Sequence, residues 1–177
     1  MFKKITLLLI VLVGLLIGSA ASITQAAEPN QHTSDVISRV DGSVIGSSTL
    51  MRKEKEIKAK FEAGGLEPGA YSIWWIITNT PGEGDGNPST LWAAGQVVEA
   101  DGKIKINAKL KVGETPGLVL TGDGLTHPFG AKVVLLSKYH GPASDDPDEL
   151  EQQLGTPNYG CDGNCPNAFM ATHEPMQ

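Results

Sequence analysis

The chain has 177 residues and a formal net charge of −6 at pH 7, and 40% of its residues are hydrophobic. This length is enough for one domain with its own core. The acidic balance disfavours nucleic acid as a partner, because the phosphate backbone would repel the protein.

Residues 1–26 have the pattern of a secretory signal peptide. Lys3 and Lys4 precede an apolar run over residues 5–17, which is followed by small residues and an acceptable cleavage site. The alternative is an uncleaved membrane anchor, but the run is short for a membrane span. We therefore expect a secreted or periplasmic protein in which residues 27–177 form a single domain, with no membrane span after cleavage. This mature chain would hold 12 basic and 20 acidic residues.

Strand patterns follow one another along the mature chain. In residues 53–63 and 103–112 apolar side chains alternate with polar ones, many of them lysine. A period of two indicates strands with one face in the core and one in water, and the row of lysines in 103–112 would also protect a sheet edge. Asp41-Gly42 either interrupts a first strand over 36–44 or forms the turn of a hairpin, and Gly95 suggests a bulge. Further strands are expected at 36–44, 45–51, 90–100, 117–120, 131–137 and 168–171.

Residues 65–79 predict a tight turn that leads into a long strand. Pro68 and Gly69 form the turn, because proline presets φ and glycine accepts a positive φ. The nine residues from 71 onward carry no charge and are rich in aromatic and β-branched side chains. Such a strand is buried on both faces, or another segment covers its second face.

Trp74 and Trp75 are adjacent on this strand, so their side chains must point to opposite faces. One can lie in the core. The other is either covered, by Trp92 or by the C-terminal tail, or lies on an outer face where it could bind a sugar, a peptide or another subunit. Covering is the expected arrangement because tryptophan is usually buried. Trp74, Trp75 and Trp92 are the candidate ligand surface if one exists.

The tail, about residues 140–177, is irregular apart from one short helix. Asp146 has the position of an N-cap, Pro147 that of the first helical residue, and Glu149 follows three residues after the cap. These features predict a helix of at most two turns.

The cysteines and histidines of interest lie in the C-terminal third. An even, close pair such as Cys161 and Cys165 usually forms a disulfide outside the cytoplasm. Together with His140 and His173 the pair could instead hold zinc or copper. A disulfide would remove the thiolates from such a site, so we expect the disulfide. A site of His127, His140 and His173 would avoid that objection.

The turn before the long strand resembles known sandwich families. Leu66-x-Pro68-Gly69-x-Tyr71 resembles a corner of fibronectin type III and other immunoglobulin-like sandwiches, where a tyrosine hydroxyl bonds back to the backbone. By this likeness Pro68, Gly69 and Tyr71 form a structural corner. The phrase Gly-Leu-x-Pro-Gly also resembles copper-zinc superoxide dismutases and chordin-type domains. The next strand here lacks their His-x-His, so the resemblance implies no dismutase activity.

A closer resemblance is to uncharacterised secreted bacterial proteins. They carry Gly-Leu-x-Pro-Gly-x-Tyr-x-x-Trp-Trp early, and His-Gly-Pro-Ala, two cysteines and Ala-x-His-x-Pro late. Here these motifs are residues 65–75, 140–143, Cys161, Cys165 and 171–175, which span most of the mature chain. That group has no established activity, so the resemblance implies a fold unit and no particular function.

Together the patterns predict an all-β fold, an antiparallel β-sandwich of about seven to eight strands with one short C-terminal helix. The sequence has no Gly-x-Ser-x-Gly elbow and no glycine pattern that cradles phosphate before a helix. We therefore expect a non-catalytic binding or structural module without a cofactor, whose partner is a small molecule, a glycan or a protein. The alternative is a copper- or zinc-binding protein that uses C-terminal histidines and cysteines, His140 and His173 among them.

Overall fold

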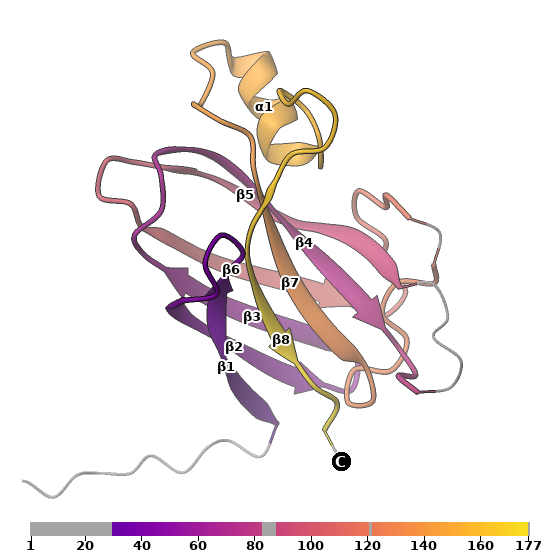
Figure 1. The fold of residues 1–177 in the computed structure, drawn as a ribbon. Helices are drawn as coiled ribbons and strands as arrows, with labels where there is room; N and C mark the ends of the chain where they lie inside the picture. Colours follow the sequence, from indigo (N-terminus) through magenta and orange to yellow (C-terminus); the bar gives the residue numbers. More distant parts are fainter. Residues whose placement is uncertain (1–29, 83–87, 121, 177) are drawn as a thin grey trace, which may run out of the picture.

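The structure, a computed structural model, describes residues 30–82, 88–120 and 122–176. The expected signal peptide, residues 1–26, lies outside the described residues. Figure 1 shows the strands wrapped around one core, with the helix beyond one end of them. In chain order the elements are β1 (Gln31–Ser38), β2 (Val44–Lys53), β3 (Glu56–Ala63), β4 (Gly69–Thr78), β5 (Ser89–Val98), β6 (Ile104–Lys111), β7 (Lys132–Tyr139), α1 (Pro147–Gly155) and β8 (Asn167–His173).

The eight strands form one antiparallel sheet in the order β5-β4-β7-β8-β1-β2-β3-β6. The two end strands, β5 and β6, also contact each other, so the sheet is nearly closed. Buried side chains from all eight strands meet in a single hydrophobic cluster. The prediction of an all-β antiparallel fold with one short C-terminal helix is confirmed, and its two layers are the two sides of one curved sheet (Figure 1).

The two stretches with alternating side chains form β3 and β6. In β3, Ile57, Ala59, Phe61 and Ala63 are buried, while Lys58, Lys60 and Glu62 between them are exposed. The residues of β6 alternate in the same way, from a buried first residue to an exposed last one. The two strands pair along their whole length, so their buried faces coincide. Local alternation alone was therefore enough to identify both strands and their inner faces.

Of two predicted irregularities, the hairpin is present and the bulge is displaced. β1 and β2 form the hairpin expected around Asp41-Gly42, where Gly42 takes a φ of 77°. β5 contains the expected bulge, but the shift in register leaves Ala93 and not Gly95 without a partner in β4. Sequence alone placed the irregularity within two residues.

The strand predicted at 117–120 is wrong. This segment leaves a turn at Gly117 and is then irregular, with a single bridge between Leu120 and Thr90 at the edge of β5. Gly117 takes a φ of 51°, which breaks the extended backbone that a ladder requires. The segment therefore lies against β5 without extending the sheet.

The turn before β4 is fixed by a tyrosine and a glycine. The Tyr71 hydroxyl donates to the carbonyl oxygen of Glu67 at 2.8 Å, and the Tyr71 ring packs against Tyr139 at a centroid distance of 5.0 Å. Burial raises the pKa of Tyr71, so the hydroxyl remains a donor. Gly69 has a φ of 151°, and a Cβ there would lie 2.3 Å from the carbonyl oxygen of Gly141. The start of β4 is thereby held against the segment that follows β7.

We predict that Tyr71→Phe lowers the free energy of unfolding by about 1 kcal/mol, because the Glu67 carbonyl loses a partly buried donor while the ring remains. Urea unfolding followed by tryptophan fluorescence would measure this difference. Tyr159→Phe is the control, since 39% of Tyr159 is exposed. Equal stability of wild type and Tyr71→Phe would show that the corner bond contributes nothing.

Candidate functional site

The face of β4 that points away from the core is covered by α1 and the tail. Tyr71, Ile73 and Trp75 lie in the core cluster, while Ser72 and Trp74 alternate with them and are equally buried. α1 contacts both β4 and β5. The helix starts as its sequence predicts, because the side chain of its N-cap accepts hydrogen bonds from the second and third helical backbone N–H groups.

The end of α1 approaches β5 very closely. A Cβ at Gly95 would lie 2.5 Å from the carbonyl oxygen of Leu154, so only glycine allows this packing. The indole N–H of Trp92 donates to the same carbonyl at 2.9 Å. Gly95 is therefore needed for the packing of α1 on β5. It is not the bulge residue that the sequence suggested.

The predicted ligand surface is contradicted for two of its three tryptophans. Trp74 is 1% exposed and Trp75 is 0% exposed, because α1 and the tail cover one face of β4 and the core covers the other. Covering, the arrangement favoured from sequence, is therefore correct. Trp92 is 36% exposed and remains the one member of the set that solvent reaches.

A chain of hydrogen bonds runs beneath this cover. The Trp74 indole N–H donates to the Ser72 hydroxyl oxygen at 2.8 Å, and that hydroxyl is 2.7 Å from His140 Nε2. His140 Nδ1 is 2.8 Å from the carbonyl oxygen of Tyr159. Since a carbonyl can only accept, His140 carries its proton on Nδ1, and Nε2 accepts from Ser72. Burial lowers the pKa of His140, so this imidazole is neutral near pH 7.

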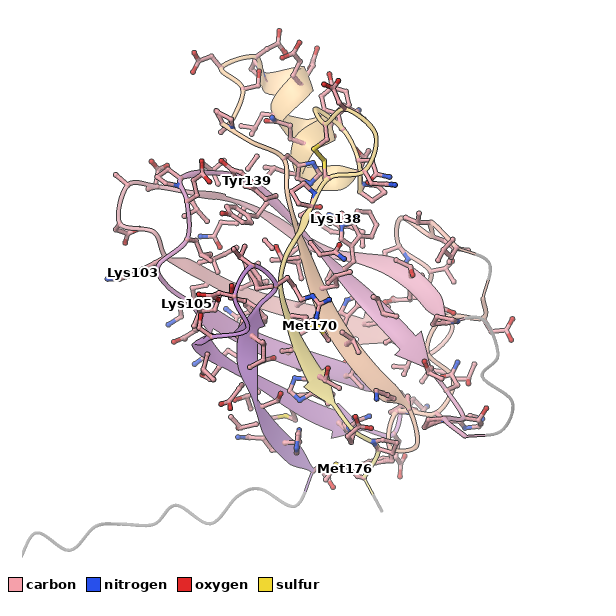
Figure 2. All side chains as sticks on the ribbon, in the orientation of Figure 1. Lys103, Lys105, Lys138, Tyr139, Met170 and Met176 are labelled. Carbon is pink, nitrogen blue, oxygen red and sulfur yellow. A yellow bond between two sulfur atoms is a disulfide. The ribbon has the colours of Figure 1, made fainter. Side chains whose placement is uncertain are left out.

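The predicted disulfide joins Cys161 and Cys165, whose Cα atoms are 5.3 Å apart. Cys165 Sγ is also 3.2 Å from His140 Nδ1. A ring nitrogen of His140 and both sulfur atoms lie within 4.8 Å of one another. Figure 2 shows the disulfide beside α1, close to the labelled Lys138 and Tyr139 at the end of β7. Cys165 is buried and Cys161 is partly exposed.

The structure contradicts a metal site shared by His140 and His173. His173 pairs with Val133 near the start of β7, whereas His140 directly follows the last residue of that strand. Seven residues of extended chain separate these levels by about 20 Å, far more than one ion can bridge. His127 precedes β7 and so lies toward the end opposite His140. The set of three histidines is therefore also wrong.

His173 belongs to a second buried cluster. Its Nε2 is 2.9 Å from the Ser48 hydroxyl, and its Nδ1 is 3.0 Å from Nδ1 of His32. Nearby, the guanidinium of Arg52 is fully buried and donates to backbone carbonyls, Ala131 at 2.8 Å and Glu174 at 2.9 Å among them. Arg52 thus ties β2 to the start of β7 and the end of β8.

Both clusters contain a serine hydrogen-bonded to a histidine, as hydrolases do. Ser48 and Ser72 are 0% exposed, and His173 and His140 are 0% and 3% exposed. No substrate can reach either hydroxyl without displacing the sheet or its cover. These pairs satisfy buried polar groups and do not form a nucleophilic site.

Sequence reasoning missed most of the partners in these clusters. Ser72 interrupts an otherwise apolar and aromatic strand, and Arg52 occupies a buried position of β2. A polar residue at such a position signals a buried hydrogen-bond network. The identity of its partner was not readable, because the partner comes from a distant part of the chain.

No family model and no curated protein matches the sequence. Among solved structures, the crystal structure of a mutant of an SOD-like protein from Bacillus subtilis is similar, with 16% identity over 81% of this chain and 97% of that one, and a TM-score of 0.39. A likeness at this level carries no argument about the chemistry of this chain. None of the helices in the described part of the chain has the length and apolar character that crossing a membrane needs.

We predict that His173 makes the protein less stable in acid. Burial, with smaller contributions from the charges of His32 and Arg52, lowers the pKa of His173 to about 4. The unfolded chain binds this proton below about pH 6.5 and the folded chain does so only near pH 4. The free energy of unfolding should therefore fall from pH 6.5 to 4, by at most about 3 kcal/mol from this residue.

Urea unfolding at pH 7 and pH 4.5 would measure this loss. His173→Gln should be less stable at pH 7 and should have a shallower dependence on pH. The exposed His127, changed to Gln, is the control and should keep the wild-type slope. An unchanged slope in His173→Gln would assign the acid sensitivity to another group.

Proposed function

We propose that this is an extracytoplasmic protein that acts by binding and not by catalysis, and that its binding centre consists of His140, Cys161 and Cys165. The observation that carries the proposal is the placement of one imidazole nitrogen and two sulfurs within 4.8 Å of one another. We infer that this centre takes a soft metal ion, Cu(I) or Zn(II), when the disulfide is reduced.

The ligand set fits these ions. Thiolates select Cu(I) and Zn(II), and imidazole suits both. Two cysteines and one histidine are also the protein ligands of some zinc sites that leave a fourth position open. Oxygen-binding ions such as Mg²⁺ or Ca²⁺ would find no carboxylate in this group of three.

The disulfide makes binding dependent on reduction. While the two sulfurs are bonded to each other, neither is a thiolate that can ligate an ion. A dithiol reductant would supply two electrons and two protons, giving two thiols and leaving the reductant as a disulfide. The thiols release their protons when the ion binds. Cys161 is the partly exposed sulfur and is therefore the one that a reductant can attack.

Ser72 is placed to assist this change. In the oxidised form His140 carries its proton on Nδ1, the nitrogen that faces Cys165. To use Nδ1 as a ligand, the imidazole must carry its proton on Nε2, from which it can donate a hydrogen bond to the Ser72 oxygen at 2.7 Å. Histidines that bind metals usually donate their other N–H to such a partner, which orients the ring.

The metal proposal is tested with purified mature protein, in reduced and oxidised form, titrated with Zn(II) in competition with a chromogenic chelator. We expect one equivalent bound by the reduced protein and none by the oxidised protein. His140→Gln should lose at least about tenfold in affinity, and Ser72→Ala about tenfold. His127→Gln should bind as wild type does.

Two results would overturn this proposal. One is a reduced protein that binds no Zn(II) and no Cu(I). The other is equal binding by wild type and His140→Gln, which would make the site a dithiol without the histidine. Circular dichroism of each variant separates loss of the site from loss of the fold.

Location is tested separately, by expressing the whole chain in a bacterium and measuring the mass of the intact product. We expect the mass of residues 27–177 less two hydrogens, because the leader is removed and the two cysteines are oxidised. A product that retains residues 1–26 would contradict the cleavage on which the extracytoplasmic location depends.

A further inference from the structure

The basic residues of the mature chain are concentrated on two paired strands and their ends. Of its 12 basic residues, eight are lysines within 53–60 and 103–111, which contain only two glutamates. By contrast, residues 145–151 at the start of α1 contain five acidic residues and no basic one. A chain with a negative total charge therefore has one strongly positive surface.

This surface is the outer face of β3 and β6. The register places Lys58 opposite Lys109 and Lys60 opposite Asn107, and all three lysines are exposed. Acidic partners lie toward the two ends of the face, where Glu62 pairs with Lys105 at 2.8 Å and Glu56 binds Lys58 at 3.1 Å. In the described part of the chain, Lys60 and Lys109 have no carboxylate within 4.0 Å.

Protection of a sheet edge does not explain these lysines. β6 is an end strand, so its lysines could serve that purpose, but β3 lies between β2 and β6 inside the sheet. Like charges placed directly opposite each other, as Lys58 and Lys109 are, destabilise a strand pair. Glu56 offsets part of this repulsion through its ion pair with Lys58, and a ligand of opposite charge would offset the rest.

The middle of the face is hollowed, with a volume of about 510 Å³. Lys58, Lys60 and Lys109 line this hollow together with Gln31, Thr49 and Asn107. Amide and hydroxyl side chains both donate and accept hydrogen bonds, so they suit a ligand that carries hydroxyl groups as well as charge.

We propose that this hollow, which we call the lysine face, binds a linear polysaccharide that carries carboxylate groups. The ammonium groups would pair with the carboxylates, and Gln31, Thr49 and Asn107 with sugar hydroxyls. The proposal is independent of the metal centre, since the lysine face lies on β3 and β6 while His140 follows β7 under α1. In Figure 2, Lys103 and Lys105, near the start of β6, are labelled at the left edge of the sheet, and the disulfide lies above the sheet beside α1.

The composition of the face favours this ligand over other polyanions. It has no arginine, the residue that binds phosphate with two parallel hydrogen bonds, and no aromatic ring on which a base could stack. Apart from Met51, it also lacks apolar side chains that could enter a lipid surface, because Ala59 and Ala108 belong to the core cluster.

The test is the affinity of the oxidised mature protein for polygalacturonate at low ionic strength, compared with the neutral polymer dextran. We expect binding to polygalacturonate only, weakened by added salt because the charges are exposed. The double variant K60E/K109E should lose at least about tenfold in affinity. The matched control K55E/K103E changes the net charge equally but lies outside the hollow, and should lose no more than about threefold.

Three outcomes would overturn the proposal. The first is no preference of wild type for polygalacturonate over dextran. The second is an equal loss in both double variants, which would mean that binding follows net charge and not the lysine face. The third is tighter binding to polyphosphate or to vesicles containing an anionic phospholipid than to polygalacturonate. All four lysines are exposed, so the variants should remain folded, as unfolding curves would verify.

Discussion

Burial of β4 on both faces is the constraint on which the rest of the structure depends. Adjacent tryptophans on one strand direct two large aromatic side chains to opposite sides, and the core can accept only one of them. Exposing the other would leave a large apolar area in water. The chain therefore has to supply a second covering layer, and α1 with the tail is that layer. α1 contacts β4, and the disulfide is linked to Trp74 only through His140 and Ser72.

The layer that covers β4 buries the polar side chains on that face of the strand as well. Ser72 is enclosed together with Trp74, and the network through His140 to the Tyr159 carbonyl satisfies every polar group involved. A disulfide between residues only four apart removes little chain entropy, so its main effect is local. It holds Cys165 against the imidazole. The same geometry that satisfies a buried histidine thus creates a group of ligand atoms.

Local patterns in the sequence were enough to predict most of the strands, the helix and the disulfide, but they placed a strand at 117–120 that is absent and set the first strand at 36–44 instead of Gln31–Ser38. β3 and β6 were readable because alternation is a property of neighbouring residues, and α1 because Asp146 and Pro147 cap it locally. The sites were not readable, because they depend on strand order. His140 and His173 both lie in the C-terminal third of the sequence, but in the structure they lie near opposite ends of β7. His32 meets His173 only because β1 pairs with β8, across most of the chain.

Net charge was the least informative of the sequence features, because it sums positive and negative charges that lie on different surfaces of the molecule. The negative total disfavours binding to any polyanion at long range, yet beyond about 10 Å exposed charges are largely screened at 0.1 M salt. A bound ligand contacts only the side chains near it, and the charged side chains on the outer face of β3 and β6 are mostly lysines. Nucleic acid is therefore disfavoured less by the total charge than by the side chains that accompany the lysines. Amides and hydroxyls there suit a hydroxylated chain, and the absence of arginine and aromatic rings from this face disfavours phosphate and bases.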